Sequence, residues 1–129
     1  MISFDGFHEE DGTPVYVQII RHIKRGVAAG TVVHGDELPS RRVLSARLGV
    51  NPNTVQKAYR VMEEEGLIRS HSGAKSFMVL EDGAAERIRE ELTEREVRAL
   101  AVGMKRAGLS LERAIRLLER VWKEAEETE

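Results

Sequence analysis

Four side chains that could contact nucleic acid recur along one short stretch of the chain. They follow a spacing of three, four and seven residues, which places them on one face if the stretch is helical. They are Asn53, Gln56, Lys57 and Arg60. Amide groups hydrogen-bond base edges, and cationic groups pair with phosphate oxygens. The pattern predicts a DNA-contacting helix face, although an ordinary solvated face has the same polar character.

The residues before this face predict a first short helix that positions it. Ser40 follows a proline and is suited to cap a helix over about residues 41–48. Its expected buried residues are Val43, Leu44 and Leu48. Gly49 should end the helix, and Val50 should fill the core beside the turn.

A second helix is expected to restart almost immediately. Asn51 can cap it, with Pro52 in the first helical position. Its apolar residues share one face and are Val55, Ala58, Tyr59 and Met62. Two helices joined by a tight glycine-containing turn form a helix-turn-helix, so the polar face described above lies on its second helix.

A β-hairpin should follow the second helix once Gly66 breaks it. Residues 67–70 and 76–79 predict its two short strands, with His71 and Lys75 near the tip and Arg69 on the flank. A hairpin directly after such a helix is the wing of a winged helix-turn-helix. An amphipathic helix over about residues 14–30 precedes these elements, and residues 32–38 suit a brief strand or an extended connection.

The last part of the chain predicts a helical hairpin. One helix should span about residues 84–107, and a second should run from the Ser110 cap to about residue 126. Two helices of this size leave an apolar face wet, which predicts a partner surface. The expected dimer-interface residues are Ile88, Leu92, Leu100, Met104, Leu111, Ile115, Leu118, Val121 and Trp122.

Charge divides the chain into three parts that match these elements. Residues 1–13 form an acidic N-terminal segment, and residues 14–80 carry ten Lys and Arg against five Asp and Glu. Residues 81–129 are acidic again, which suits a dimerisation tail that stays away from phosphates. The expected fold is mainly α with a small β-hairpin, a winged helix-turn-helix followed by a two-helix dimerisation hairpin.

Composition restricts the classes of function that remain. The chain has 129 residues and no cysteine, and it lacks both an apolar run of membrane-spanning length and the basic and apolar regions of a signal peptide. A cytoplasmic location with no membrane partner is therefore expected. Four scattered histidines, no phosphate-binding glycine loop and no nucleophile motif predict no metal, no cofactor and no enzyme activity.

Several stretches within residues 14–80 combine into one order of motifs. They are residues 14–19, 38–44, 48–55, 58–59 and 63–68, together with Gly30, Gly35, Gly73 and Phe77. This order resembles the DNA-binding module of the GntR family of bacterial regulators. The run Asn51-Pro52-Asn53-Thr54-Val55, followed by Ala58-Tyr59 and a short helical tail, is similar to the YtrA-like subfamily.

The resemblance implies roles for particular residues. Arg42 would contact DNA at the start of the first short helix, and Gly73 would approach the minor groove at the wing tip. The complete set of predicted DNA contacts is Arg41, Arg42, Asn51, Asn53, Thr54, Gln56, Lys57, Arg60, Ser72, Gly73 and Lys75. Two positions depart from the family pattern. His34 replaces a usual proline, so the bend there should be less fixed, and Lys75 replaces a usual wing glycine.

The predicted function is a sequence-specific transcription regulator that binds an inverted-repeat operator as a homodimer. The resemblance implies a repressor, with a transporter operon and its own gene as targets. A small-molecule effector stays open, as does control by protein abundance alone. A winged helix used for protein interaction is the competing reading, and an apolar or acidic face in place of Asn53, Gln56 and Arg60 would favour it.

Overall fold

The structure is a computed structural model, and it describes residues 1–10, 12–71 and 75–128. The chain forms two compact units, Met1–Glu90 and Glu91–Glu129. The division falls later than the composition change at residue 80, because Ala84 and Ile88 are buried in the first unit.

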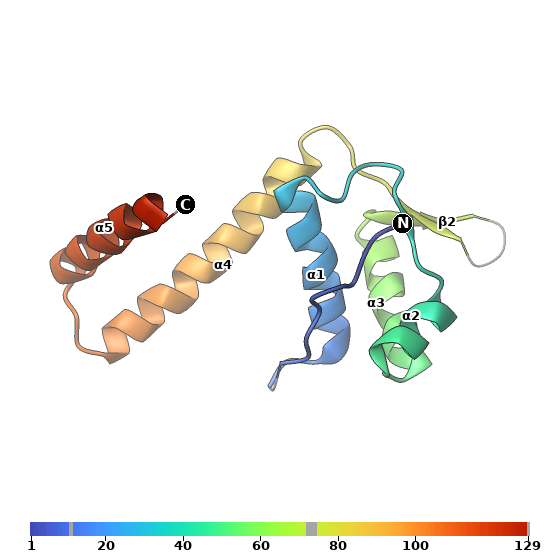
Figure 1. The fold of residues 1–129 in the computed structure, drawn as a ribbon, viewed down its shortest axis with the longest axis horizontal. Helices are drawn as coiled ribbons and strands as arrows, with labels where there is room; N and C mark the ends of the chain where they lie inside the picture. The colour runs from blue at the N-terminus through green and yellow to red at the C-terminus, as the bar shows by residue number, and fades with distance from the viewer. Residues whose placement is uncertain (11, 72–74, 129) are drawn as a thin grey trace. The chain divides into compact units, whose positions relative to one another are not determined.

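The first unit is built on three helices that pack together (Figure 1). Helix α1 spans Val15–Ala29, directly after Pro14, and ends at Gly30 in the left-handed conformation with φ of 82°. The helix-turn-helix consists of α2, Arg41–Leu48, and α3, Pro52–Glu64. Both α1 and α2 contact α3, so α3 is held from two sides with one face left outward.

Side-chain caps fix the turn between α2 and α3 as the sequence predicted. Ser40 Oγ accepts a hydrogen bond from the backbone nitrogen of Val43 at 3.2 Å. Asn51 Oδ1 accepts one from the backbone nitrogen of Asn53 at 2.8 Å. Inside the turn, Ser45 Oγ donates to the carbonyl oxygen of Val50 at 2.7 Å. These bonds satisfy backbone groups that a helix end leaves without partners.

The core prediction for α2 was wrong at Val43, whose side chain is 50% exposed. Successive helical residues differ by about 100° around the axis, and an eight-residue helix can turn only one narrow face to its neighbour. That face carries Leu44 and Ser45, which are buried, with Leu48 half-buried. Val50 is likewise half-buried and lies at the edge of the core.

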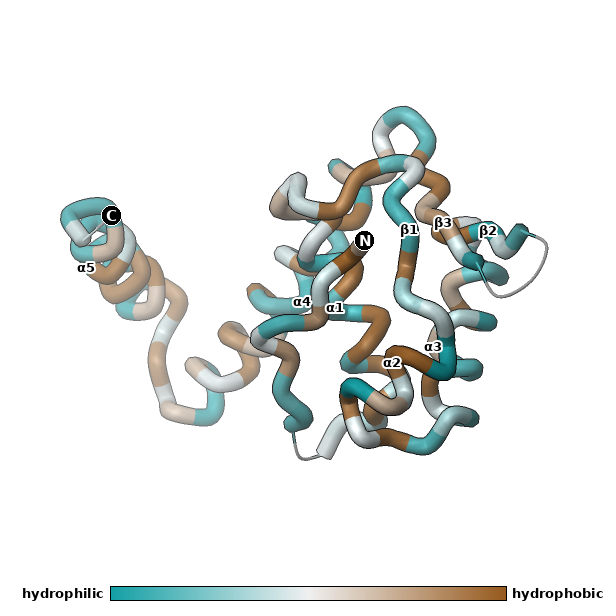
Figure 2. Tube along the Cα trace, turned by 45° about the vertical axis from the view of Figure 1, so that its right-hand side comes forward, coloured by the Kyte–Doolittle hydropathy of each residue, from teal (hydrophilic) through white to brown (hydrophobic). Residues whose placement is uncertain are grey.

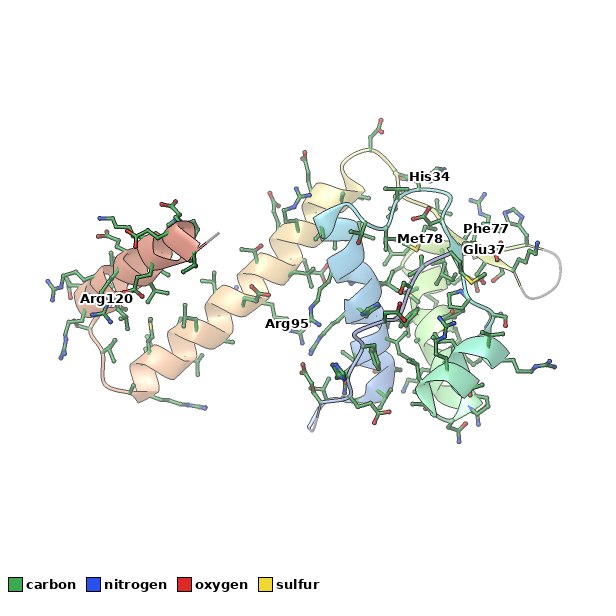
Figure 3. The ribbon with its side chains drawn as sticks, viewed as in Figure 1. His34, Glu37, Phe77, Met78, Arg95 and Arg120 are labelled. Carbon is green, nitrogen blue, oxygen red and sulfur yellow. The ribbon has the colours of Figure 1, made fainter. Side chains whose placement is uncertain are left out.

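A three-stranded antiparallel sheet completes the first unit. Its strands are β1, Glu37–Leu38, β2, Ile68–Ser70, and β3, Ser76–Met78, in the order β1-β3-β2. The hairpin strands were predicted, and residues 32–38 contribute both an extended connection and the short β1. Leu38, Ile68 and Met78 are buried beneath the sheet. Phe77 pairs in register with Glu37, and the two lie near one another in Figure 3.

The N-terminal residues belong to the folded unit, which their acidic character did not reveal. Ile2 and Phe4 are buried, and the Ile2 backbone nitrogen donates to the carbonyl oxygen of Glu37 at 2.9 Å. The Phe4 ring stacks on the ring of His22, with 4.6 Å between centroids. Gln18 donates to the carbonyl oxygens of Glu10 and Thr13 at 2.9 and 2.7 Å. These contacts attach the N-terminal residues to α1 and to β1.

Two helices account for the second unit, although the first of them begins in the first unit. Helix α4 spans Ala84–Arg106, and α5 spans Leu111–Thr128. Gly108 adopts a φ of 83° between them, and Ser110 Oγ accepts a hydrogen bond from the backbone nitrogen of Arg113. The predicted helical hairpin is confirmed. Apolar residues recur along α5 in Figure 2, yet no residue of this helix is buried.

Candidate nucleic-acid interface

The outward face of α3 carries the predicted polar side chains. Asn53, Gln56, Lys57 and Arg60 are all exposed. The opposite face is fully enclosed, because Val55, Ala58, Tyr59 and Met62 are each 0% exposed. The first turn of α3 contains no acidic residue, so nothing there repels a phosphate group. The helix therefore presents amides and cations to solvent on a firmly anchored backbone.

Tyr59 fixes α3 against the start of α2. Its hydroxyl donates to the carbonyl oxygen of Pro39 at 2.6 Å, just before the α2 cap. Burial raises the pKa of the Tyr59 phenol well above its ordinary value, and the nearby Arg41 guanidinium opposes that rise. The phenol consequently stays protonated and able to donate at neutral pH.

Arg41 and Lys57, both predicted DNA contacts, also have aromatic partners within the chain. The Arg41 guanidinium carbon lies 5.3 Å from the centre of the Tyr59 ring, and its Nε is shielded from solvent. Lys57 Nζ lies 4.2 Å from the centre of the Tyr16 ring on α1. Cation–π contacts of this kind contribute about 0.5–1 kcal/mol at exposed sites. Each residue thus has a structural role that its spacing could not indicate.

The remaining contacts predicted near the turn occupy its exposed edge. Arg42 is exposed in the first turn of α2, and Asn51 is exposed at the α3 cap. Thr54 is half-buried, and its backbone nitrogen donates to the Asn51 carbonyl oxygen at 2.9 Å. The cap uses one lone pair of Asn51 Oδ1, so the second lone pair and the amide nitrogen of this side chain stay available to a partner.

The wing is described only in part. Lys75 is exposed, and its carbonyl oxygen accepts a hydrogen bond from the backbone nitrogen of His71 at 2.9 Å. Ser72 and Gly73, two predicted contacts, lie outside the described residues. Glu63, which the sequence suggested was only a surface charge of the helix, accepts through Oε1 from the backbone nitrogen of Ser70 at 3.2 Å and links α3 to the wing.

The bend at residues 34–35 is better fixed than the absence of proline suggested. His34 Nδ1 accepts a hydrogen bond from the backbone nitrogen of Leu80 at 3.0 Å. The backbone nitrogen of Gly35 donates to the carbonyl oxygen of Met78 at 2.9 Å. Proline offers no side-chain acceptor for this purpose. Where the family usually has the rigid ring of proline, His34 therefore holds the bend by a side-chain hydrogen bond to the end of the wing.

Ile88 was expected to lack a partner within its own chain, and that premise was wrong. It is only 5% exposed, because the first turns of α4 pack on the first unit. Arg89, the next residue, donates through Nη2 to the carbonyl oxygen of Ala28 at the end of α1, at 2.8 Å. A side chain enclosed in this way has almost no surface left for a second copy. Leu92 is half-buried.

The other residues expected at the dimer interface lie in the second unit, and most remain accessible. Trp122 is 64% exposed and Leu111 is 72% exposed. Apolar side chains from α4 and α5 line a groove of about 250 Å³ between these helices. The remaining members are Leu100, Met104, Ile115, Leu118 and Val121, of which only Met104 is half-buried rather than exposed.

Other kinds of site find little support in the described part of the chain. No group of three or more His, Asp or Glu side chains there is placed to hold a metal ion. Among the helices so described, none combines the length and the apolar character that crossing a bilayer needs. The helix-turn-helix, its amide and cation face and the adjoining sheet define a winged helix-turn-helix regulator that binds DNA.

Comparison with known proteins specifies the family. The profile described as "Bacterial regulatory proteins, gntR family" matches residues 15–78. The HTH-type transcriptional repressor YtrA of Bacillus subtilis is 36% identical over 119 residues, which cover 88% of this chain and 85% of that protein. This chain therefore belongs to the gntR family and is a YtrA-like, DNA-binding transcription regulator, not an enzyme.

Solved structures agree with this assignment. A GntR family transcriptional regulator from Listeria monocytogenes aligns with a TM-score of 0.75 at 28% identity, covering 87% of this chain and 98% of that one. YtrA from Sulfolobus acidocaldarius, described as a GntR-family transcription factor, aligns with a TM-score of 0.56 at 36% identity. That alignment covers 77% of this chain and 99% of the other. The winged helix-turn-helix fold predicted from the sequence is confirmed.

Proposed function

We propose that this regulator is a repressor that binds an inverted-repeat operator as a homodimer. The observation that carries the proposal is the solvent face of α3, with exposed Asn53, Gln56 and Arg60 above a fully buried opposite face. One winged module buries too little surface for high specificity, and two related by a dyad read half-sites about one helical turn apart. The similarity to a protein named as a repressor supports the direction of control.

The residues of the interface divide into two roles. Asn53 and Gln56 are proposed to read base edges, since exposed amides offer both a donor and an acceptor. Arg42, Arg60 and Lys75 are proposed to hold phosphates, because all three are exposed cations. Lys57, which lies over the Tyr16 ring, is also proposed to hold a phosphate. Arg41, which lies over the Tyr59 ring, is proposed as a further DNA contact. Ser72 and Gly73 complete the proposed contacts at the wing, with Asn51 and Thr54 at the turn.

The helical tail is proposed as the dimer interface. Along α5, Leu111, Ile115, Leu118, Val121 and Trp122 remain between 44% and 72% exposed. An apolar face of this kind is covered most simply by the same face of a second copy across a two-fold axis. The proposed targets, a transporter operon and the protein's own gene, rest on the family resemblance, and selection of bound genomic fragments tests them.

The base-reading role is tested by Asn53→Ala on operator DNA and on mixed-sequence DNA. The operator is first obtained by selecting the genomic fragments that the protein retains. We expect a loss of about 1–3 kcal/mol on the operator and little change on mixed DNA. Affinities are measured by fluorescence anisotropy over a series of salt concentrations, because phosphate contacts appear in the salt dependence.

Arg60→Ala is the matched comparison on the same helix face. It should weaken binding to both DNAs and flatten the salt dependence, as expected when one phosphate contact is removed. Arg60 is preferred to Lys57 here, because Lys57 also contacts Tyr16 and its removal would change the stability of the protein as well as its contact with DNA. Equal losses on both DNAs for Asn53→Ala would remove this residue from base reading.

A further inference from the structure

A hollow of about 140 Å³ lies between residues 6–10 and the outer face of α1. Four helical residues at spacings of three, four and seven form one wall, namely Gln18, Arg21, His22 and Arg25. The opposite wall includes His8 and Glu10. Nothing in the DNA interface uses these residues, since they belong to α1 and the N-terminal segment rather than to α2, α3 or the wing.

The walls of the hollow are held together by uncharged contacts rather than by ion pairs. Gln18 accepts from the backbone nitrogen of Glu10 at 2.8 Å and donates back to its carbonyl oxygen. His22 Nε2 lies 2.9 Å from the carbonyl oxygen of Ser3, and its ring stacks on Phe4. The shape of the hollow therefore does not depend on carboxylates closing onto the arginines.

Both arginines of the hollow lack a carboxylate partner among the described residues. No ion pair of Arg21 or Arg25 with a described acid is formed, and Glu10 is the one acid in the described lining. Asp11 lies outside the described residues. Arg21 Nε is shielded from solvent without a hydrogen-bond partner. Because solvent does not reach this nitrogen, a ligand in the hollow would contact the accessible parts of the two guanidinium groups rather than Arg21 Nε.

We propose that this hollow binds a small oxyanion, a phosphate or carboxylate group carried by a free metabolite or present as the free ion. Guanidinium groups are permanently charged and match the paired oxygens of both groups. The volume corresponds to roughly four or five water molecules at about 30 Å³ each, which suits such a group with little else. The adjoining hollow at residues 1–5 is larger, yet Asp5 and Asp36 line it and make it less suited to an anion.

Binding at this site would act on the first unit as a whole. The ligand would contact both residues 6–10 and α1, and α1 in turn holds α3 through the Lys57–Tyr16 contact and the ion pair of Lys24 with Glu65 at 3.3 Å. A ligand that binds only the folded state stabilises it by an amount that grows with the logarithm of ligand concentration above the dissociation constant. The phosphate titration that tests this site does not require operator DNA.

The test titrates the full-length protein with inorganic phosphate against chloride at equal ionic strength, with acetate as a parallel arm. Thermal unfolding and backbone amide NMR shifts are recorded. We expect the unfolding midpoint to rise with the logarithm of phosphate concentration, and the amide shifts to saturate and to be confined to residues 6–10 and α1. Arg25→Gln should weaken the apparent affinity at least tenfold, and Arg21→Lys should weaken it while keeping the charge. The arm with the stronger saturable response, phosphate or acetate, identifies the oxyanion class.

Arg47→Gln is the matched control, an exposed arginine in the last turn of α2 with the same change of charge in the same unit. It should bind phosphate as the unaltered chain does. Equal weakening in Arg25→Gln and Arg47→Gln, or shifts without saturation, would show only general charge attraction and overturn the proposal. The phosphate that the two arginines bind could instead belong to the DNA backbone, and binding to mixed-sequence DNA distinguishes this case. A larger loss for Arg25→Gln than for Arg47→Gln there, with no saturable phosphate response, would assign the arginines to the DNA backbone and also overturn it.

Discussion

Tyr59 lies where the scaffold and the DNA-facing surface meet, because its ring supports α3 and its hydroxyl holds the residue before the α2 cap. Tyr59→Phe leaves the buried carbonyl of Pro39 without this donor. We expect a loss of about 1–3 kcal/mol in the free energy of unfolding at neutral pH. Urea unfolding followed by circular dichroism measures it. A loss close to zero would show that another group replaces the hydroxyl.

The raised pKa of Tyr59 predicts sensitivity to alkali. Below about pH 10 the phenol is protonated in both the folded and the unfolded states. Above that pH the unfolded chain loses this proton first, so the free energy of unfolding falls as pH rises. The advantage of the unaltered chain over Tyr59→Phe should therefore shrink between pH 10 and 11.5. The two proteins share every other ionisable group, so an advantage that stays constant would contradict this account.

At the scale of single residues, the spacing in the sequence predicted which side chains of α3 are exposed, but it did not predict which residues form hydrogen bonds with one another. Asn53, Gln56 and Arg60 face solvent as expected, because helical periodicity alone decides which side they occupy. Gln18 and Glu63 have partners five to eight residues away, on segments whose paths no periodicity fixes. Gln18 lies on the face of α1 opposite its apolar stripe, so helical periodicity gave no signal that this side chain is buried.

Among the elements, the N-terminal segment gives the sharpest stability prediction. Phe4 is 3% exposed and stacks on His22, so Phe4→Ala should cost about 3–5 kcal/mol in the free energy of unfolding. Chemical denaturation monitored by circular dichroism provides the value. Phe7→Ala is the control, since Phe7 is half-buried and should cost less. Equal losses in the two variants would show that burial of Phe4 against His22 adds nothing to the free energy of unfolding beyond what Phe7 contributes.

Helix ends were predictable because their chemistry is local. Ser40, Asn51 and Ser110 each cap a helix through a side-chain oxygen within three residues, and Gly30 and Gly49 end helices at positive φ. The N-terminal segment was not predictable in this way. It has no repeating pattern, and its two buried apolar residues, Ile2 and Phe4, are placed by contacts with distant parts of the chain.

For the whole molecule, assembly is the property to measure. Trp122→Asp should weaken self-association at least about a hundredfold, since each of two copies loses about 1.5–3 kcal/mol of apolar burial. Operator affinity should fall with it, while mixed-sequence binding changes little. Sedimentation equilibrium beside operator titration measures both. Lys123→Ala, a neighbouring exposed residue of α5, should leave assembly intact. A Trp122→Asp protein that still dimerises would exclude this face.

The boundary between the units affects how such experiments are built. A chain ended after residue 81, where composition changes, would lose Ala84 and Ile88 from the core of the first unit. A chain ended after Glu90 retains both. Composition could not place this boundary, because a helix that crosses from one compact unit into another shows the same charge-rich pattern on both sides of the crossing.

On α3, residues proposed only to read bases lie beside a residue that also contacts the rest of the fold, and this has an evolutionary consequence. In the described part of the chain, the Asn53 and Gln56 side chains form no hydrogen bond or ring contact, whereas Lys57 on the same face lies over Tyr16. Under the proposed roles, substitutions at positions 53 and 56 change which operator is read without disturbing the fold. A lineage could therefore acquire new target genes by exchanging these two amides, whereas a change at position 57 would also remove the contact with Tyr16.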